Sequence, residues 1–115
     1  KLLKTIFISL AKRIWYSYRR AINLSYNDST ARLYDCLDFI IKTKEGEKRG
    51  KSYFFDVTFN DLRVMTNTKD TKDDQLKDFI NDDNIQIGYG LLSIQNLEKF
   101  EDTLKLYLAR ERTRQ

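Results

Sequence analysis

The spacing of apolar residues changes twice in the second half of the chain, and this change constrains the fold most. Residues 58–65 and about 70–81 carry apolar side chains three or four positions apart, as helices do. Between them, Thr66-Asn67-Thr68 predicts a tight turn in which Asn67 takes the left-handed conformation. Residues 85–94 alternate apolar and polar side chains around Gly88-Tyr89-Gly90, which predicts a β-hairpin. Two short helices, a tight turn and a hairpin are the winged helix-turn-helix arrangement.

Further elements surround this unit. Good N-cap residues at Asn27-Asp28-Ser29 and a helical apolar pattern predict a helix near residues 29–42. A polar, glycine-containing loop over 43–51 and a short strand over 53–57 should follow. Thr58-Phe59-Asn60-Asp61 is close to a capping box, and a last helix should span about 96–111. The expected fold class is α+β, mostly α.

Residues 1 to about 25 predict one long helix with a coiled-coil seam. Trp15, Tyr18 and Ile22 are among the residues that widen its apolar stripe, so the stripe needs a covering surface. Packing within one domain, pairing with a second copy, and binding of a basic amphipathic helix to a membrane surface are the three alternatives. We expect a dimerisation helix over 1–26 and a second domain over 27–115. The predicted dimerisation residues are Leu3, Phe7, Leu10, Ile14, Ser17 and Ala21.

The composition argues against an enzyme. The chain has no His, which is the commonest general base and metal ligand, and its single Cys cannot form a zinc cluster. The Asp pairs at 73–74 and 82–83 point in different directions on a helix, so we expect neither catalytic nor metal-ligating residues. Cys36 on an apolar helix face is typical of a core residue and fits a reducing cytoplasm. The apolar run at 5–11 is too short to span a membrane, and no targeting segment is apparent.

Charge is unevenly distributed along the chain. The net charge is +4, yet residues 1–21 hold six Lys or Arg and no acid. Residues 68–84 hold three Lys and six Asp. A basic segment permits contact with nucleic acid or anionic lipid without requiring either.

Several motifs together resemble the C-terminal half of the Crp/Fnr family of bacterial transcription regulators. Leu10-Ala11-Lys12-Arg13-Ile14 is similar to the family's dimer helix, and Arg32-Leu33 to the start of its next helix. Residues 57–62 resemble the strand and first helix of its DNA-binding motif. Lys69-Asp70-Thr71 stands where the family has Arg-Glu-Thr, and residues 85–97 resemble its wing.

The resemblance implies a dimeric, sequence-specific regulator whose recognition helix, about 70–81, enters the major groove of double-stranded DNA. It also implies RNA polymerase as a partner. A preceding sensor domain would bind a small-molecule effector, so we expect this chain to be part of a longer protein, with no cofactor in this part. Lys69 would read guanine and Asp70 cytosine. The full set of predicted DNA contacts is Thr58, Asn60, Thr68, Lys69, Asp70, Thr71, Lys72, Gln75 and Lys77.

Three departures from the family pattern favour a second hypothesis. Thr66 or Asn67 replaces the turn glycine, Lys72 replaces a small apolar residue, and the recognition segment is acidic. Carboxylates oppose phosphate binding, because release of counterions drives much of the affinity. The alternative is a winged-helix protein-interaction module that has lost DNA binding and uses its acidic face on a basic partner.

Overall fold

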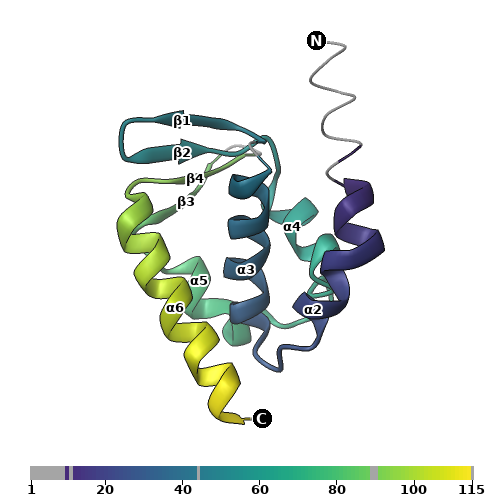
Figure 1. The fold of residues 1–115 in the computed structure, drawn as a ribbon. Coiled ribbons are helices and arrows are strands. Elements are labelled where there is room, and N and C mark those ends of the chain that lie inside the picture. Colours follow the sequence, from purple (N-terminus) through teal and green to yellow (C-terminus); the bar gives the residue numbers. More distant parts are fainter. Residues whose placement is uncertain (1–9, 11, 44, 89–90, 115) are drawn as a thin grey trace.

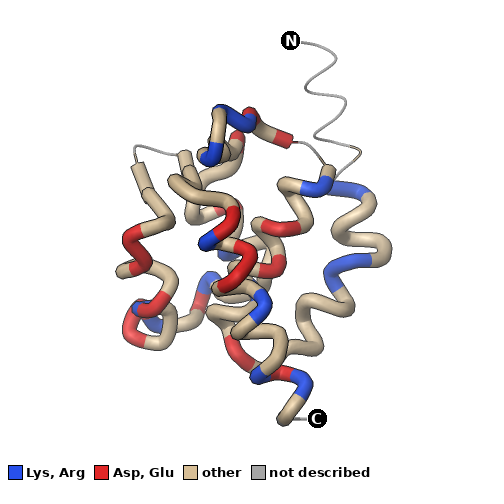
Figure 2. Tube along the Cα trace, turned by 60° about the vertical axis from the view of Figure 1, so that its left-hand side comes forward, with Lys and Arg blue, Asp and Glu red and all other residues tan. Residues whose placement is uncertain are grey.

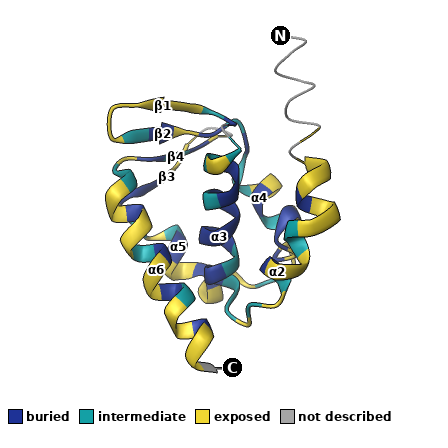
Figure 3. Cartoon of the chain, viewed as in Figure 1, coloured by how far each residue is buried: buried dark blue, intermediate teal, exposed yellow. Residues whose placement is uncertain are grey.

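Helix α3 (Ser29–Lys42) runs through the centre of the fold (Figure 1). The helix was predicted near residues 29–42, and its observed bounds confirm this prediction. Its N-cap is Asp28, whose side chain accepts a hydrogen bond from the Thr30 amide. Nine of its side chains are buried, on more than one face, because other elements surround it (Figure 3). Cys36 is fully buried, as predicted, and burial raises the pKa of its thiol. The thiol therefore stays protonated inside the core.

The computed structural model describes residues 10, 12–43, 45–88 and 91–114, and in this part of the chain the fold is α+β. The N-terminal helix consists of helical residues before Trp15 followed by η1 (Trp15–Arg19) and α2 (Arg20–Leu24). The other elements are β1 (Glu47–Arg49), β2 (Ser52–Phe54), α4 (Phe59–Met65), η2 (Asp73–Leu76), α5 (Lys77–Ile80), β3 (Ile85–Ile87), β4 (Leu92–Ile94) and α6 (Leu97–Arg114).

The four strands form an antiparallel sheet in the order β1-β2-β4-β3. The β3–β4 hairpin is present as predicted, although its tip, Tyr89-Gly90, lies outside the described residues. The polar loop predicted over 43–51 is wrong in part, because it contains β1. All three β1 residues are exposed, so this edge strand has no apolar alternation to reveal it. The predicted strand 53–57 ends at Phe54, but Phe55 and Val57 still bond to the Leu92 backbone.

The N-terminal helix is docked on the domain through one face. Trp15 is fully buried, lies 5.0 Å from Phe39 between ring centroids, and donates from Nε1 to the Met65 carbonyl at 3.0 Å. Two turns further on, Asn23 Nδ2 donates to Asp35 at 3.0 Å, and Arg19 forms an ion pair with the same carboxylate. Packing within the domain therefore covers this face of the helix. Within the described residues, no helix combines the length and hydropathy that a membrane crossing needs.

Gly46, in the loop between α3 and β1, has a φ of +117° and lies against β2. A Cβ at this position would lie 2.3 Å from the Phe54 carbonyl oxygen, a backbone atom that cannot move aside cheaply. We expect Gly46→Ala to lower the free energy of unfolding by about 2–3 kcal/mol. Gly50→Ala is the matched control, because its φ is +61° but nothing lies within 4 Å, and should cost about 1 kcal/mol. If urea denaturation showed the same loss of stability for both variants, Gly46 would not lie as close to the Phe54 carbonyl as described.

Glu45, the neighbour of Gly46, has a buried side chain whose Oε1 finds no hydrogen-bond partner among the described residues. Burial raises the pKa of Glu45 to about 7; Lys12 opposes this rise and Asp56 adds to it. The folded state therefore holds a proton that the unfolded chain releases near its ordinary pKa of about 4.3. The resulting stabilisation is complete below that value and is lost as the pH rises through 7.

We expect the free energy of unfolding to fall by about 2 to 3 kcal/mol between pH 5 and pH 8 because of Glu45. Glu45→Gln should remove this part of the pH dependence and make the protein more stable than the wild type at pH 8. The measurement is urea denaturation of both proteins across this range. Parallel stability curves would show that Glu45 ionises freely in the folded state.

Candidate nucleic-acid interface

The connection between α4 and η2 is longer than the predicted three-residue turn. Asn67 takes a φ of +55°, as predicted, and the Thr68 amide bonds to the Arg63 carbonyl at 2.8 Å. The chain then stays irregular as far as Lys72, whose ψ of 146° is extended. The predicted helix over 70–81 is therefore wrong in its first turn and in its continuity. A 3-10 turn, η2, precedes the single α-helical turn α5.

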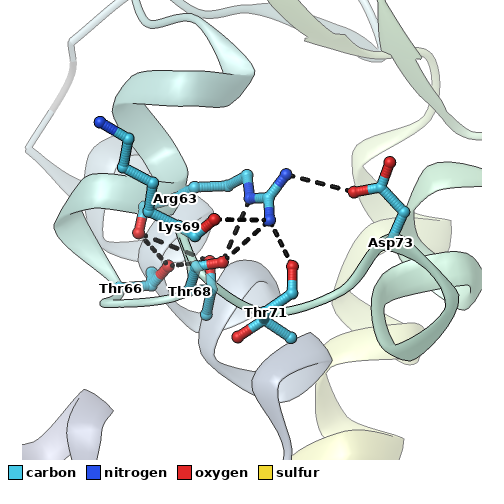
Figure 4. Close-up of polar contacts among 6 residues, drawn as sticks. All are labelled: Arg63, Thr66, Thr68, Lys69, Thr71 and Asp73. Atoms are coloured by element: carbon cyan, nitrogen blue, oxygen red, sulfur yellow. Dashed lines mark hydrogen bonds and ion pairs between the residues drawn. The ribbon is translucent and has the colours of Figure 1, made fainter.

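Arg63, on the last turn of α4, gathers this connection around its guanidinium (Figure 4). Its Nη2 donates to the carbonyl oxygens of Thr68 at 3.1 Å, Lys69 at 3.0 Å and Thr71 at 2.5 Å. Nη1 pairs with Asp73 Oδ1 at 3.3 Å. The Thr68 carbonyl also accepts the Thr71 amide at 3.0 Å, which closes a turn and not a helical bond. The bonds to Arg63 thus hold the connection in a path that differs from the predicted first helical turn.

The predicted contact residues fall into three groups by exposure. Thr58 and Thr71 are half-buried, and Thr68 is fully buried. The Thr68 hydroxyl lies 3.0 Å from that of Thr66, so its side chain faces the protein interior and its prediction as a DNA contact is wrong. The exposed members are Asn60, Lys69, Asp70, Lys72, Gln75 and Lys77.

Thr58 and Asn60, two of the predicted DNA contacts, lie at the N-terminus of α4. The capping box is complete there: Thr58 Oγ1 accepts from the Asp61 amide at 2.9 Å, and Asp61 Oδ2 accepts from the Thr58 amide at 3.2 Å. The Asp61 carboxylate thus places a negative charge at this helix end, which opposes the binding of a phosphate there. The side chain of Asn60 is exposed at this end of α4, so its prediction as a DNA contact stands as a prediction.

Three acidic side chains of the recognition segment have hydrogen-bond or ion-pair partners within the protein. Asp73 pairs with Arg63, Asp82 Oδ2 accepts from the Tyr34 hydroxyl of α3 at 2.6 Å, and Asp78 accepts from the Tyr107 hydroxyl of α6 at 3.4 Å. Burial and the bond to Asp82 raise the pKa of Tyr34, so the hydroxyl remains a donor.

The segment stays acidic after these contacts, because a hydrogen bond from a tyrosine hydroxyl does not cancel the charge of a carboxylate. With Asp73 paired to Arg63, exposed Lys69, Lys72 and Lys77 stand against Asp70, Asp74, Asp78, Asp82 and Asp83. In Figure 2, red predominates on the left, where the chain leads into β3, and blue runs along the N-terminal helix on the right. Pairing of Asp73 with Arg63 lowers the repulsion of phosphate by one charge, and the rest of the segment stays acidic.

The predicted dimer seam lies on the face of the N-terminal helix that points away from the domain. Leu3 and Phe7 lie outside the described residues, whereas Leu10, Ile14, Ser17 and Ala21 are exposed. η1 is a π-helical turn, in which the Arg20 amide bonds to the Trp15 carbonyl five residues back. Its wider turn adds one residue to the register, so Tyr18 and Ile22 continue the apolar stripe beyond Ile14. Tyr18 is 77% exposed and Ile22 is 53% exposed.

Arg63 is the functional candidate that sequence reasoning missed, because one basic residue near a helix C-terminus is common and carries no ligand signal. Among the described residues, no three His, Cys, Asp or Glu side chains gather as a metal site would require. A hollow of about 490 Å³ lies between α3, the β1–β2 hairpin and α6, away from Arg63, and its lining includes Ile41, Tyr53 and Phe100. Comparisons with protein-family models, curated protein sequences and solved structures give no match to this chain.

Proposed function

We propose that the chain is a winged helix-turn-helix DNA-binding domain of a dimeric transcription regulator of the Crp/Fnr type. The observation that carries this proposal is the order of elements and strands. α4, the irregular connection 66–72 and η2–α5 follow β2, and the β3–β4 hairpin returns to pair β4 with β2. This order supports a helix-turn-helix followed by a wing, the arrangement that the sequence predicts.

In this proposal, the exposed connection after α4 and the start of η2 face the major groove. Lys69 is exposed, and its side chain points away from the Arg63 guanidinium (Figure 4), so it is free to meet a base edge. A lysine can donate to guanine O6 and N7, although it lacks the fixed fork of arginine. Lys72 and Lys77 then neutralise phosphates and give the complex its salt dependence.

The test is selection of preferred sites from a random duplex library, followed by affinity measurements with the Lys69→Ala variant. We expect a two-fold-symmetric site, with half-sites about one helical turn apart. Lys69→Ala should lose about 1 kcal/mol of discrimination at one base position in each half-site. Lys105→Ala, an exposed lysine on α6, is the matched control and should keep full discrimination. Failure to enrich any sequence at modest salt would overturn the proposal.

The dimer in this proposal pairs two N-terminal helices through Leu10, Ile14, Tyr18 and Ile22. These four side chains are 46–77% exposed and lie opposite the face that Trp15 and Asn23 dock on the domain. Analytical ultracentrifugation should show that Ile22→Asp shifts the protein towards the monomer. Ser17→Asp, off the stripe after the π-helical turn, should shift it less.

A second candidate function is capture of a basic protein partner by the exposed carboxylates Asp70, Asp74 and Asp83. The two functions predict opposite effects of the double change Asp70→Asn and Asp74→Asn. It should strengthen binding to duplex DNA if the segment faces phosphates, and weaken binding to a basic partner if the carboxylates are the contacts. Duplex affinity and partner capture with the same variant therefore separate the two functions.

A further inference from the structure

We propose that Arg63 is the positioning residue of the recognition surface: it does not touch DNA, but fixes the backbone of residues 68–73 and thereby sets sequence discrimination. This inference rests on the proposed function and assigns a role to a residue that lies outside the predicted contacts.

The guanidinium of Arg63 is already engaged by the protein. Besides the three carbonyls and Asp73, its Nε donates to the Thr68 carbonyl at 3.2 Å. Its carbon atom lies 5.6 Å from the centre of the Phe59 ring, and that ring stacks on Phe79 of α5 at 5.7 Å. The side chain is only 17% exposed. With its donors directed inward and its face on an aromatic ring, the group has little left to offer a phosphate or a base.

The same contacts determine what the connection presents to solvent. Because the carbonyls of Thr68, Lys69 and Thr71 all turn towards one cation, the backbone between them follows a fixed path. Lys69 extends away from that cation (Figure 4), and Lys72 is exposed just before η2 begins. A base contact needs its side chain held to within about 0.5 Å, and a loop achieves this only when its backbone is fixed.

The planar fork of arginine is needed for this arrangement. Three carbonyls and a carboxylate lie around one guanidinium, which offers five N–H groups in a planar fork, whereas the lysine ammonium has three donors on a single atom. Without the fork, residues 70–72 are free to join the helix that their sequence favours, which would move Lys69 and Lys72 relative to η2.

The experiment compares wild type, Arg63→Gln, Arg63→Lys and Asp73→Asn on a duplex selected by the wild type and on a scrambled duplex. We expect both Arg63 variants to reduce the ratio of specific to non-specific affinity at least tenfold, while non-specific affinity changes less than threefold. Asp73→Asn keeps the three carbonyl contacts, so its ratio should change less than threefold. Amide NMR spectra should show that changes in the Arg63 variants are concentrated at residues 66–73 and that the core is intact.

The outcomes separate this inference from the proposed function. A wild type without sequence preference would overturn both. A wild type with preference and an Arg63→Gln variant with an unchanged ratio would overturn the role of Arg63 alone. Wild-type behaviour of Arg63→Lys would also overturn it, because charge rather than the fork would then suffice. Equal weakening on both duplexes would mark Arg63 as an ordinary phosphate contact and contradict the inference.

Discussion

Replacing Trp15 with alanine is expected to lower the free energy of unfolding by about 3–5 kcal/mol, as removal of a fully buried large aromatic side chain does. The ring packs against Phe39, and its N–H bonds to the Met65 carbonyl. The substitution therefore removes apolar contact with the core. It also leaves the Met65 carbonyl with the longer bond from Arg20 Nε, at 3.3 Å, as its remaining side-chain donor. Urea denaturation monitored by circular dichroism measures this change in the free energy of unfolding.

Two variants separate the contributions at this position. Trp15→Phe keeps most of the packing and loses the hydrogen bond, so it should cost about 1–2 kcal/mol beyond the change in ring size. Tyr16→Ala, on the adjacent residue with a 48% exposed side chain, should cost less than about 1 kcal/mol. A Trp15→Ala loss as small as that of Tyr16→Ala would mean that the N-terminal helix is not docked as described.

The second large effect is expected from Asp35→Ala, at about 3 kcal/mol. Asp35 is 2% exposed and accepts hydrogen bonds from Arg19 and Asn23, which join the N-terminal helix to α3. Removing the carboxylate leaves a partly buried guanidinium without this acceptor and leaves the buried Asn23 amide with only the Arg32 carbonyl at 2.8 Å. This loss costs far more than the ion pair itself contributes. Thermal and urea denaturation at low and high salt should both show the loss, because a buried pair is weakly screened.

Asp38→Ala is the control for Asp35, one turn away on the same helix. Asp38 pairs at 2.8 Å with Lys42, whose side chain is 75% exposed, so this i, i+4 pair should contribute less than about 0.5 kcal/mol. If Asp35→Ala cost no more than Asp38→Ala, the buried network between the N-terminal helix and α3 would be absent in solution.

Secondary structure is most predictable from the sequence where burial of one or more faces makes apolar residues recur at the spacing of a helix or strand. α3 is buried along its whole length, and its N-cap and apolar spacing predict both ends. The capping box at Thr58 and the left-handed Asn67 also follow from local chemistry alone. β1 has no such signal, because an exposed edge strand is held by backbone bonds to β2 rather than by its side chains.

The candidate site is less predictable, because its shape depends on one long-range side chain. The helical pattern of residues 70–81 is real, yet Arg63 diverts the carbonyls that the first turn would use. The hydrogen bonds that Asp78 and Asp82 accept from tyrosines on α6 and α3 likewise depend on tertiary packing. Trp15 was placed beside the dimer seam, but the π-helical turn and a buried partner direct it into the core.

The central claim is that the connection after α4 and the start of η2 form the DNA-binding surface. Titration of the ¹⁵N-labelled chain with a duplex that it selects, followed by amide NMR, tests this most directly. The account predicts that the largest shift changes fall on residues 67–77, and that they weaken steeply as salt is raised. Shift changes confined to other surfaces, such as α6 or the β1–β2 hairpin, or the absence of saturable changes, would contradict it.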